Sequence, residues 1–133
     1  MFCDNKFLTL YSRNHRQYAF PQGHCEEGEE LSDTIIREIR EETGFKNVEI
    51  IQPLTTYGYR FYDKGKITHK IITCFLVQLQ SFKKIKKQFE THEAYINYFF
   101  TATDIIKKLS WAEDKEMIVL AQKVILKNKK PSL

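Results

Sequence analysis

Three glutamates are close together in a segment whose apolar residues have the spacing of an α-helix. At about 100° per residue, Glu38, Glu41 and Glu42 fall within an arc of about 100° on one side of that helix. Carboxylates packed so closely repel one another, and a purely structural helix normally pairs them or spreads them over its solvent face. A divalent cation removes the repulsion, and Mg²⁺ prefers a few carboxylates together with waters and substrate phosphates. The cluster therefore predicts a metal site for phosphate chemistry.

Two glycines bracket the loop that leads into this helix. Because neither Gly23 nor Gly28 has a side chain, the backbone can approach a ligand here, and a backbone carbonyl can join the metal shell. A bare Glu-x-x-Glu-Glu is usually solvated charge. The complete pattern is more specific, because its fixed residues would match a given start by chance with a probability on the order of 10⁻⁸. These residues are Gly23, Glu29, Arg37, Glu38, Glu41, Glu42 and Gly44.

The segment from Gly23 to Phe45 resembles the Nudix box at every fixed position, including the apolar position Ile39. The resemblance implies the fold of that family, an α/β/α sandwich with a mixed β-sheet, in which the box forms a loop, a helix and a second loop. It also implies a pyrophosphohydrolase that binds Mg²⁺ or Mn²⁺ and lets water attack a phosphorus atom of a nucleotide substrate.

The same resemblance implies a role for each residue of the box. The implied metal ligands are Glu38, Glu41, Glu42 and the carbonyl of Gly23. Glu29 and Arg37 are implied to form an ion pair that braces the loop against the helix. The general base in this family is a glutamate of the box or of a later loop, so the catalytic candidates are Glu41, Glu38, Glu90 and Glu93. Glu41 is the first choice, while Glu90 and Glu93 also fit surface positions beside a basic loop.

Segments outside the box resemble the diadenosine tetraphosphate hydrolase branch of the family. They are Pro21-Gln22-Gly23-His24, Lys70-Ile71-Ile72, His92-Glu93-Ala94-Tyr95 and Lys115-Glu116-Met117. The resemblance implies that Lys70 contacts phosphate and that Tyr95 stacks on a base. His24 and Tyr62 are further candidates for substrate contact. From the residues alone, Lys70 equally fits a charge at a strand edge, and Tyr95 a half-buried strand residue.

Two alternatives remain open. Pro-Gln-Gly also occurs in RNA 5′-pyrophosphohydrolases, so an RNA 5′ end is the second candidate substrate, although those enzymes usually have a second glycine where His24 stands. The other alternative is a non-catalytic sensor that binds a nucleotide. The complete set of box carboxylates argues against a sensor, because a degenerate site would be expected to lose them.

The elements that must position these residues follow from apolar periodicity and turn residues. We expect helices at residues 31–43, 104–109 and 113–127, and strands at residues 6–12, 48–52, 55–62, 70–79 and 95–101. Gly44 is placed to end the first helix, residues 63–66 form a hairpin turn, and residues 14–23 form a loop. The apolar face of the last helix is expected to comprise Met117, Leu120, Ala121, Val124 and Ile125. Mixed strands and helices indicate an α/β fold, and the hairpin excludes a purely parallel sheet.

The family fold normally begins with a strand before the one expected at residues 6–12, and five residues precede it here. We therefore expect the first strand to be missing or shortened. A neighbouring subunit in a homodimer is one way to cover the edge that this leaves.

Composition indicates one domain over residues 1–133, with 42% hydrophobic residues available for a core. No apolar run is long enough for a membrane span and no secretory signal is recognised, so we expect a cytoplasmic protein with no membrane partner. The cysteines have no metal-type spacing and are expected to be reduced thiols. The formal net charge of +4 suits attraction of a polyanion, but no DNA-reading helix or aromatic platform for nucleic acid is recognised, so no DNA partner is expected.

Overall fold

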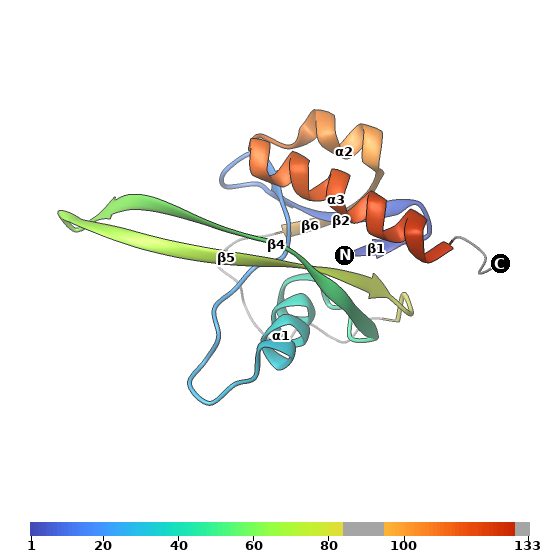
Figure 1. Cartoon of the computed structure of the whole chain (residues 1–133), viewed down its shortest axis with the longest axis horizontal. Coiled ribbons are helices and arrows are strands. Elements are labelled where there is room, and N and C mark those ends of the chain that lie inside the picture. The colour runs from blue at the N-terminus through green and yellow to red at the C-terminus, as the bar shows by residue number, and fades with distance from the viewer. Residues whose placement is uncertain (84–94, 130–133) are drawn as a thin grey trace.

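The computed structural model describes residues 1–83 and 95–129. In Figure 1 a twisted sheet lies between α1 on one face and α2 with α3 on the other. The strands are β1 (Phe2–Cys3), β2 (Lys6–Ser12), β3 (Gln17–Ala19), β4 (Val48–Asp63), β5 (Lys66–Leu79) and β6 (Tyr95–Thr101). The helices are α1 (Leu31–Thr43), α2 (Ala102–Lys108) and α3 (Ala112–Lys129). The expected α/β sandwich with a mixed sheet is confirmed.

The sheet has two parts that β1 connects. Its strand order is β3-β2-β1-β5-β4. β1 and β3 pair with the two ends of one edge of β2, and β6 pairs with the opposite edge along its whole length. β1 is antiparallel to β2 and parallel to β5, where Phe2 lies beside Gln78. The first strand of the fold is therefore present but reduced to Phe2 and Cys3. Two residues are enough to join the β4–β5 hairpin to the rest of the sheet.

Two apolar clusters cover the opposite faces of the sheet. Phe7 and Leu76 pack with residues of α2 and α3, whereas Leu8 and Val77 pack with Ile39 of α1. Successive side chains of a strand point to opposite faces, so neighbouring residues of β2 and β5 belong to different clusters. The helices are thereby held at fixed positions relative to the same strands.

The helix that carries the box glutamates begins and ends where the sequence predicts. Gly44 has φ 84°, and its N–H donates to the carbonyl of Arg40 at 3.0 Å, which closes the helix in a left-handed cap. The turn predicted at residues 63–66 is also present, with φ 50° at Lys64 and 77° at Gly65. Two positive φ angles are typical of the tight turn that joins two strands of a hairpin.

Three expectations about the elements are wrong. The two strands predicted at residues 48–52 and 55–62 are one strand, β4, in which irregular pairing near Ile51 and Leu54 takes up the extra residues. The predicted loop at residues 14–23 contains β3. On α3 the buried residues are Ile118 and Ala121, while Leu120 is 36% exposed, so the helix is rotated from the expected face.

No helix among residues 1–83 and 95–129 is long and apolar enough to cross a membrane.

Candidate active site

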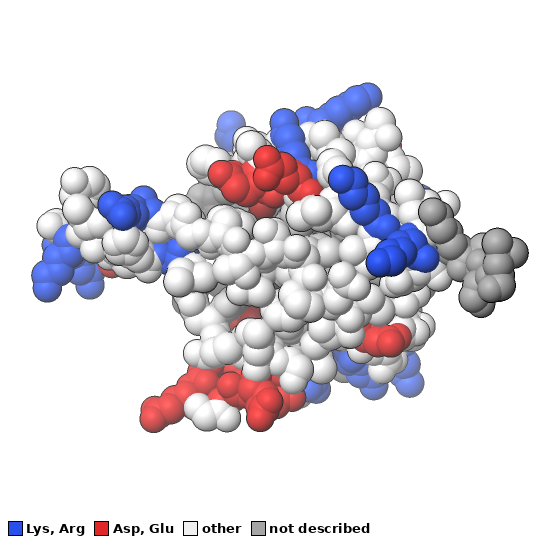
Figure 2. All heavy atoms as spheres, in the orientation of Figure 1, with Lys and Arg blue, Asp and Glu red and all other residues white. Residues whose placement is uncertain are grey.

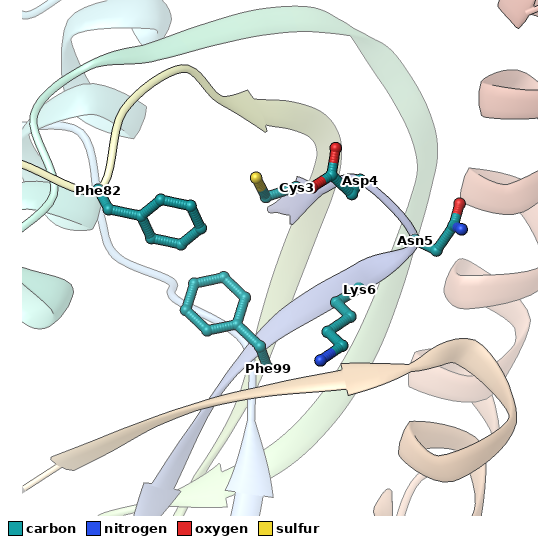
Figure 3. Close-up of a pocket in the computed structure, with 6 residues that line it drawn as sticks. All are labelled: Cys3, Asp4, Asn5, Lys6, Phe82 and Phe99. Atoms are coloured by element: carbon teal, nitrogen blue, oxygen red, sulfur yellow. The ribbon is translucent and has the colours of Figure 1, made fainter.

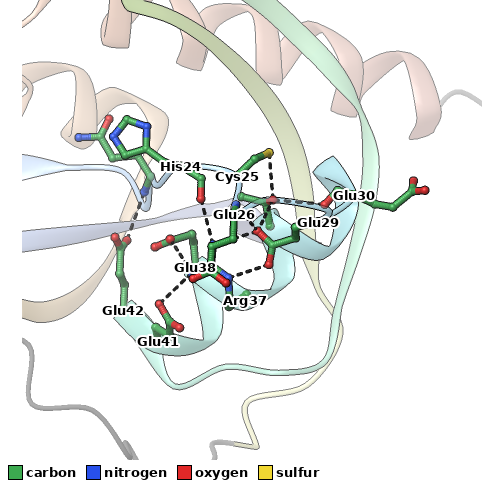
Figure 4. Close-up of polar contacts among 11 residues, drawn as sticks. His24, Cys25, Glu26, Glu29, Glu30, Arg37, Glu38, Glu41 and Glu42 are labelled. Carbon is green, nitrogen blue, oxygen red and sulfur yellow. Dashed lines mark hydrogen bonds and ion pairs between the residues drawn. The ribbon is translucent and has the colours of Figure 1, made fainter.

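Arg37 is the centre of the polar network at the start of α1 (Figure 4). Its Nε donates to Glu29 Oε2 at 2.8 Å and its Nη2 donates to Glu29 Oε1 at 3.0 Å. The same Nη2 donates to the carbonyl of His24 at 3.0 Å. The two hydrogen bonds to Glu29 form a bidentate pair, which is stronger than a single hydrogen bond between a guanidinium and a carboxylate. The loop before the helix is therefore fixed to the helix at two places.

The Glu29 carboxylate has donors on several sides. Thr34 Oγ1 donates to its Oε1 at 2.7 Å, and the backbone N–H of Glu26 donates to the same oxygen at 3.1 Å. The hydrogen bonds from Arg37, then those from Thr34 and Glu26, lower the pKa of Glu29 from 4.5 to about 2. In turn, Glu29 raises the pKa of Arg37. This ion pair is therefore fully charged at neutral pH.

The three box glutamates lie on the edge of α1 that faces this loop. Arg37 Nη1 donates to Glu38 Oε1 at 2.8 Å and to Glu41 Oε2 at 3.3 Å. Glu42 Oε2 accepts a hydrogen bond from the backbone N–H of Gln22 at 3.2 Å. Within the described residues, no group of three acidic, imidazole or thiol side chains converges on a single point. In this arrangement, the single positive charge of Arg37 offsets part of the negative charge of Glu38 and Glu41.

Gly23 lies against the carboxylate of Glu38. A Cβ atom built at position 23 would collide with Cδ, Oε1 and Cγ of Glu38. A side chain at this position would thus push Glu38 out of its place. The close approach fits a metal site, because it brings the backbone of a residue whose carbonyl is a hard oxygen donor next to a carboxylate of the kind that Mg²⁺ binds.

Contacts at its C-terminal end hold α1 on the sheet. Asn97 Nδ2 on β6 donates to the carbonyl of Thr43 at 2.9 Å. Thr43 is fully buried and its hydroxyl accepts from the N–H of Phe45 at 3.1 Å. Phe45 packs edge to face against Phe99. These contacts fix the edge of the helix on which Glu38, Glu41 and Glu42 lie.

The structure does not bring all predicted substrate contacts to this edge. Lys70 is on the same strand face as Leu76, which packs toward α2 and α3, whereas α1 covers the other face. Tyr62 is 80% exposed near the tip of the β4–β5 hairpin, away from α1 (Figure 1). Tyr95 is partly buried at the start of β6, opposite Ser12 of β2. His24 is exposed in the loop that Arg37 holds. Glu90 and Glu93 lie outside the described residues.

A pocket of about 460 Å³ lies near the end of β2 at which Lys6 stands (Figure 3). Its lining residues are Cys3, Asp4, Asn5, Lys6, Phe82 and Phe99. None of the residues proposed from the sequence lines it. Phe82 and Phe99 also contact Phe45, so this pocket is next to the segment that follows α1.

Several residues that shape the site were not predicted. Thr34 supports Glu29, the backbone of Gln22 supports Glu42, and Asn97 supports the end of α1. Thr34 could have been found, because at about 100° per residue it lies on the same edge of the predicted helix as Glu38 and Glu41. Asn97 gives no local signal, since its role depends on pairing between strands distant in sequence.

The family follows from this fold and from the sequence pattern together. The pattern of the NUDIX domain family matches residues 2–121, and the chain belongs to that family. RNA pyrophosphohydrolase of Sulfurovum sp. is 32% identical over 108 residues, which are 74% of this chain and 67% of that protein. The RNA pyrophosphohydrolase of Bartonella bacilliformis is 31% identical over 87 residues, 65% of this chain and 51% of that protein.

The same fold occurs in solved structures. The binary complex of C. elegans Ap4A hydrolase has a TM-score of 0.71 and 22% identity, and the match covers 92% of this chain and 87% of that one. At this identity the likeness concerns the fold alone. The chain spans about half the length of several curated relatives, the Bartonella protein among them.

Proposed function

We propose that this chain hydrolyses a phosphoanhydride bond in a nucleoside polyphosphate with Mg²⁺ or Mn²⁺, and that its leading substrate is diadenosine tetraphosphate. The observation that carries the proposal is the arrangement of Glu38, Glu41 and Glu42 along the edge of α1 that faces Gly23. A family relationship alone fits many substrates. The leading substrate is supported by the sequence segments outside the box, which resemble the diadenosine tetraphosphate hydrolase branch.

In this proposal the box residues hold the metal ion, accept a proton and brace the loop, and Glu41 has the first two of these tasks. Glu38, Glu41, Glu42 and the carbonyl of Gly23 would hold the metal ion, which when bound neutralises phosphate charge and lowers the pKa of water. Glu41 accepts the proton of the water that attacks phosphorus. Arg37 and Glu29 do not touch the substrate, but hold the loop that presents Gly23. Glu90 or Glu93 is the alternative base from a later loop.

An RNA 5′ end is the second candidate substrate. It is favoured by the two relatives named RNA pyrophosphohydrolase, at 31% and 32% identity. Both substrates present a chain of phosphates to the same carboxylate edge, so the difference must arise from contacts with the nucleoside part.

A substrate panel tests the assignment. The purified protein is assayed with Mg²⁺ or Mn²⁺ on diadenosine tetraphosphate, nucleoside triphosphates, ADP-ribose and triphosphorylated RNA, in heavy-oxygen water so that the label marks the phosphorus attacked. We expect the highest kcat/KM on diadenosine tetraphosphate. Efficient cleavage of another member of the panel without turnover of this one rules out the leading substrate.

A single amide substitution tests the carboxylate site itself. Glu42→Gln should abolish turnover and leave the melting temperature nearly unchanged, because an amide is a poor ligand for a hard cation. Glu27→Gln, an exposed change in the preceding loop, is the control and should keep full activity. Wild-type rates from Glu42→Gln would remove the mechanism. Tight nucleotide binding by the wild-type protein without metal and without product would favour the sensor instead.

We also infer that residues 1–133 act as one domain in the cytoplasm. Limited proteolysis that leaves the chain intact, and cell fractionation that recovers it with soluble markers, are the expected results.

A further inference from the structure

The outer part of the β4–β5 hairpin, residues 58–71, projects from the body of the molecule, and we refer to it as the arm (Figure 1). Every residue from Gly58 to Ile67 is exposed. Along the arm the two strands pair with each other, and the described part of the chain gives neither strand a second partner there. A two-stranded ribbon without packing on a face is at best marginally stable in water. The arm therefore lacks the packing that such a ribbon needs.

The arm exposes more apolar surface than a solvated hairpin requires. The large apolar side chains are Tyr59 (43% exposed), Phe61 (39%), Tyr62 (80%), Ile67 (58%) and Ile71 (76%). They lie on both faces of the ribbon. Tyr59 is opposite Lys70 and Tyr62 is opposite Ile67, so the two pairs are three residues apart along each strand. Residues an odd number of positions apart on a strand point to opposite faces. Large apolar side chains exposed on both faces of an unsupported ribbon favour an interface with another protein surface. The isoleucines favour packing against protein over stacking on bases.

The charges of the chain show which protein surface would fit. The arm contains Arg60, Lys64, Lys66 and Lys70, with Asp63 as its single carboxylate. Residues 26–33, before and in the first turn of α1, contain Glu26, Glu27, Glu29, Glu30 and Asp33 and no lysine or arginine. Figure 2 shows basic residues at the end of the arm and acidic residues over the α1 region, separated by uncharged surface. Within one chain these two surfaces do not meet.

We propose that the arm binds a second copy of this chain, with its basic residues against the acidic segment 26–33 of that copy. Two copies related by a twofold axis make this contact twice, since each arm reaches the acidic segment of the other. The contact covers the apolar residues of the arm and supplies strand edges with protein neighbours. It also places the arm of one copy beside the loop that leads to Gly23 of the other.

Charge reversal in pairs tests this contact by sedimentation velocity at low salt. The wild-type protein should sediment as a dimer at micromolar concentration, and both Arg60→Glu/Lys66→Glu and Glu27→Lys/Glu30→Lys should sediment as monomers. In an equimolar mixture of the two variants, the altered arm of one meets the altered segment of the other, and the two unaltered surfaces form the second contact, so the dimer should return. Lys107→Glu/Lys123→Glu, with the same change of charge on exposed positions of α2 and α3, should stay dimeric.

The readout is the oligomeric state, which does not depend on whether the chain hydrolyses nucleotides. A wild-type monomer across this concentration range overturns the proposal, as does a mixture of variants that remains monomeric. Fluorescence anisotropy with a labelled oligouridine tests whether the arm binds RNA. Arm-dependent RNA binding by a monomeric protein would assign the arm to nucleic acid and overturn the contact between copies.

Discussion

Arg37 holds both oxygens of the Glu29 carboxylate, at 2.8 Å from Nε and 3.0 Å from Nη2, across the loop that begins the box. The same guanidinium reaches Glu38 and Glu41 on the helix. One cation thereby determines the position of the loop and of two candidate metal ligands. Without a bound metal ion, it also limits the repulsion between them.

The first prediction concerns pH. The pKa of Glu29 is 4.5 in an unfolded chain and about 2 in the folded one, so folding favours the ionised form. The resulting stabilisation is complete above pH 4.5 and is lost as the pH falls toward 2. Glu29→Gln should melt below the wild type at neutral pH, and the difference should shrink through this window. Melting curves at a series of pH values measure it, with Glu27→Gln as control. A difference that stays constant with pH would contradict the prediction.

The second prediction concerns the contact between Gly23 and Glu38. In Gly23→Ala the new methyl group occupies the space of the Glu38 carboxylate, so that side chain must rotate away. We expect kcat/KM to fall by at least about 10- to 100-fold, the range for changes in groups that orient a metal ligand, with little change in melting temperature. Gly58→Ala is a matched control, because its methyl group would lie 3.4 Å from the carbonyl oxygen of Lys70, an ordinary contact. Equal activities of the two variants would show that Glu38 need not be held there.

The third prediction concerns the end of α1. Asn97→Asp removes the N–H that donates to the carbonyl of Thr43 and places a carboxylate near the negative end of the helix dipole. The free energy of unfolding should fall by about 1–3 kcal/mol at neutral pH. Urea denaturation measures this loss, and the exposed Asn47→Asp provides the comparison. Unchanged stability in Asn97→Asp would mean that the helix end is held by other contacts.

How far the sequence predicts the site depends on whether the signal is local. The apolar spacing of α1 and the glycine at position 44 are local, and they place both ends of the helix correctly. Pairing is not local. Pro53 falls between the two predicted strands, yet it lies in β4 at the edge of the sheet, opposite Phe75, where a missing N–H is tolerated. β1 and β3 are too short to show periodicity and exist because β2 pairs with them.

The face of α3 illustrates another limit. Residues 117–121 are Met, Ile, Val, Leu and Ala, which surround the helix with apolar side chains. Periodicity cannot select a face from such a run, and packing against α2 and the sheet buries Ile118 and leaves Leu120 at the surface. The direction of Lys70 was also not predictable, because it depends on which face of β5 packs against α2 and α3. That packing joins segments distant in sequence and gives no local signal.

The fourth prediction concerns the cluster beneath α1. Leu8 is completely buried and packs with Ile39 and Val77, so Leu8→Ala should lower the free energy of unfolding by about 2–5 kcal/mol. Leu126→Ala, at a position that is 63% exposed, should change it by less than about 0.5 kcal/mol. Urea denaturation of both variants measures the difference. A similar small loss in both would mean that the side of the sheet facing α1 is loosely packed.

The alternation of Phe7 and Leu8 between the two apolar clusters restricts how β2 can change in evolution. An insertion or deletion of one residue would turn every following side chain to the wrong face and disturb both clusters at once. Substitutions of similar size remain acceptable, because each affects one side. Variation among homologous chains should therefore accumulate here by replacement of residues, with gaps confined to the connections on either side.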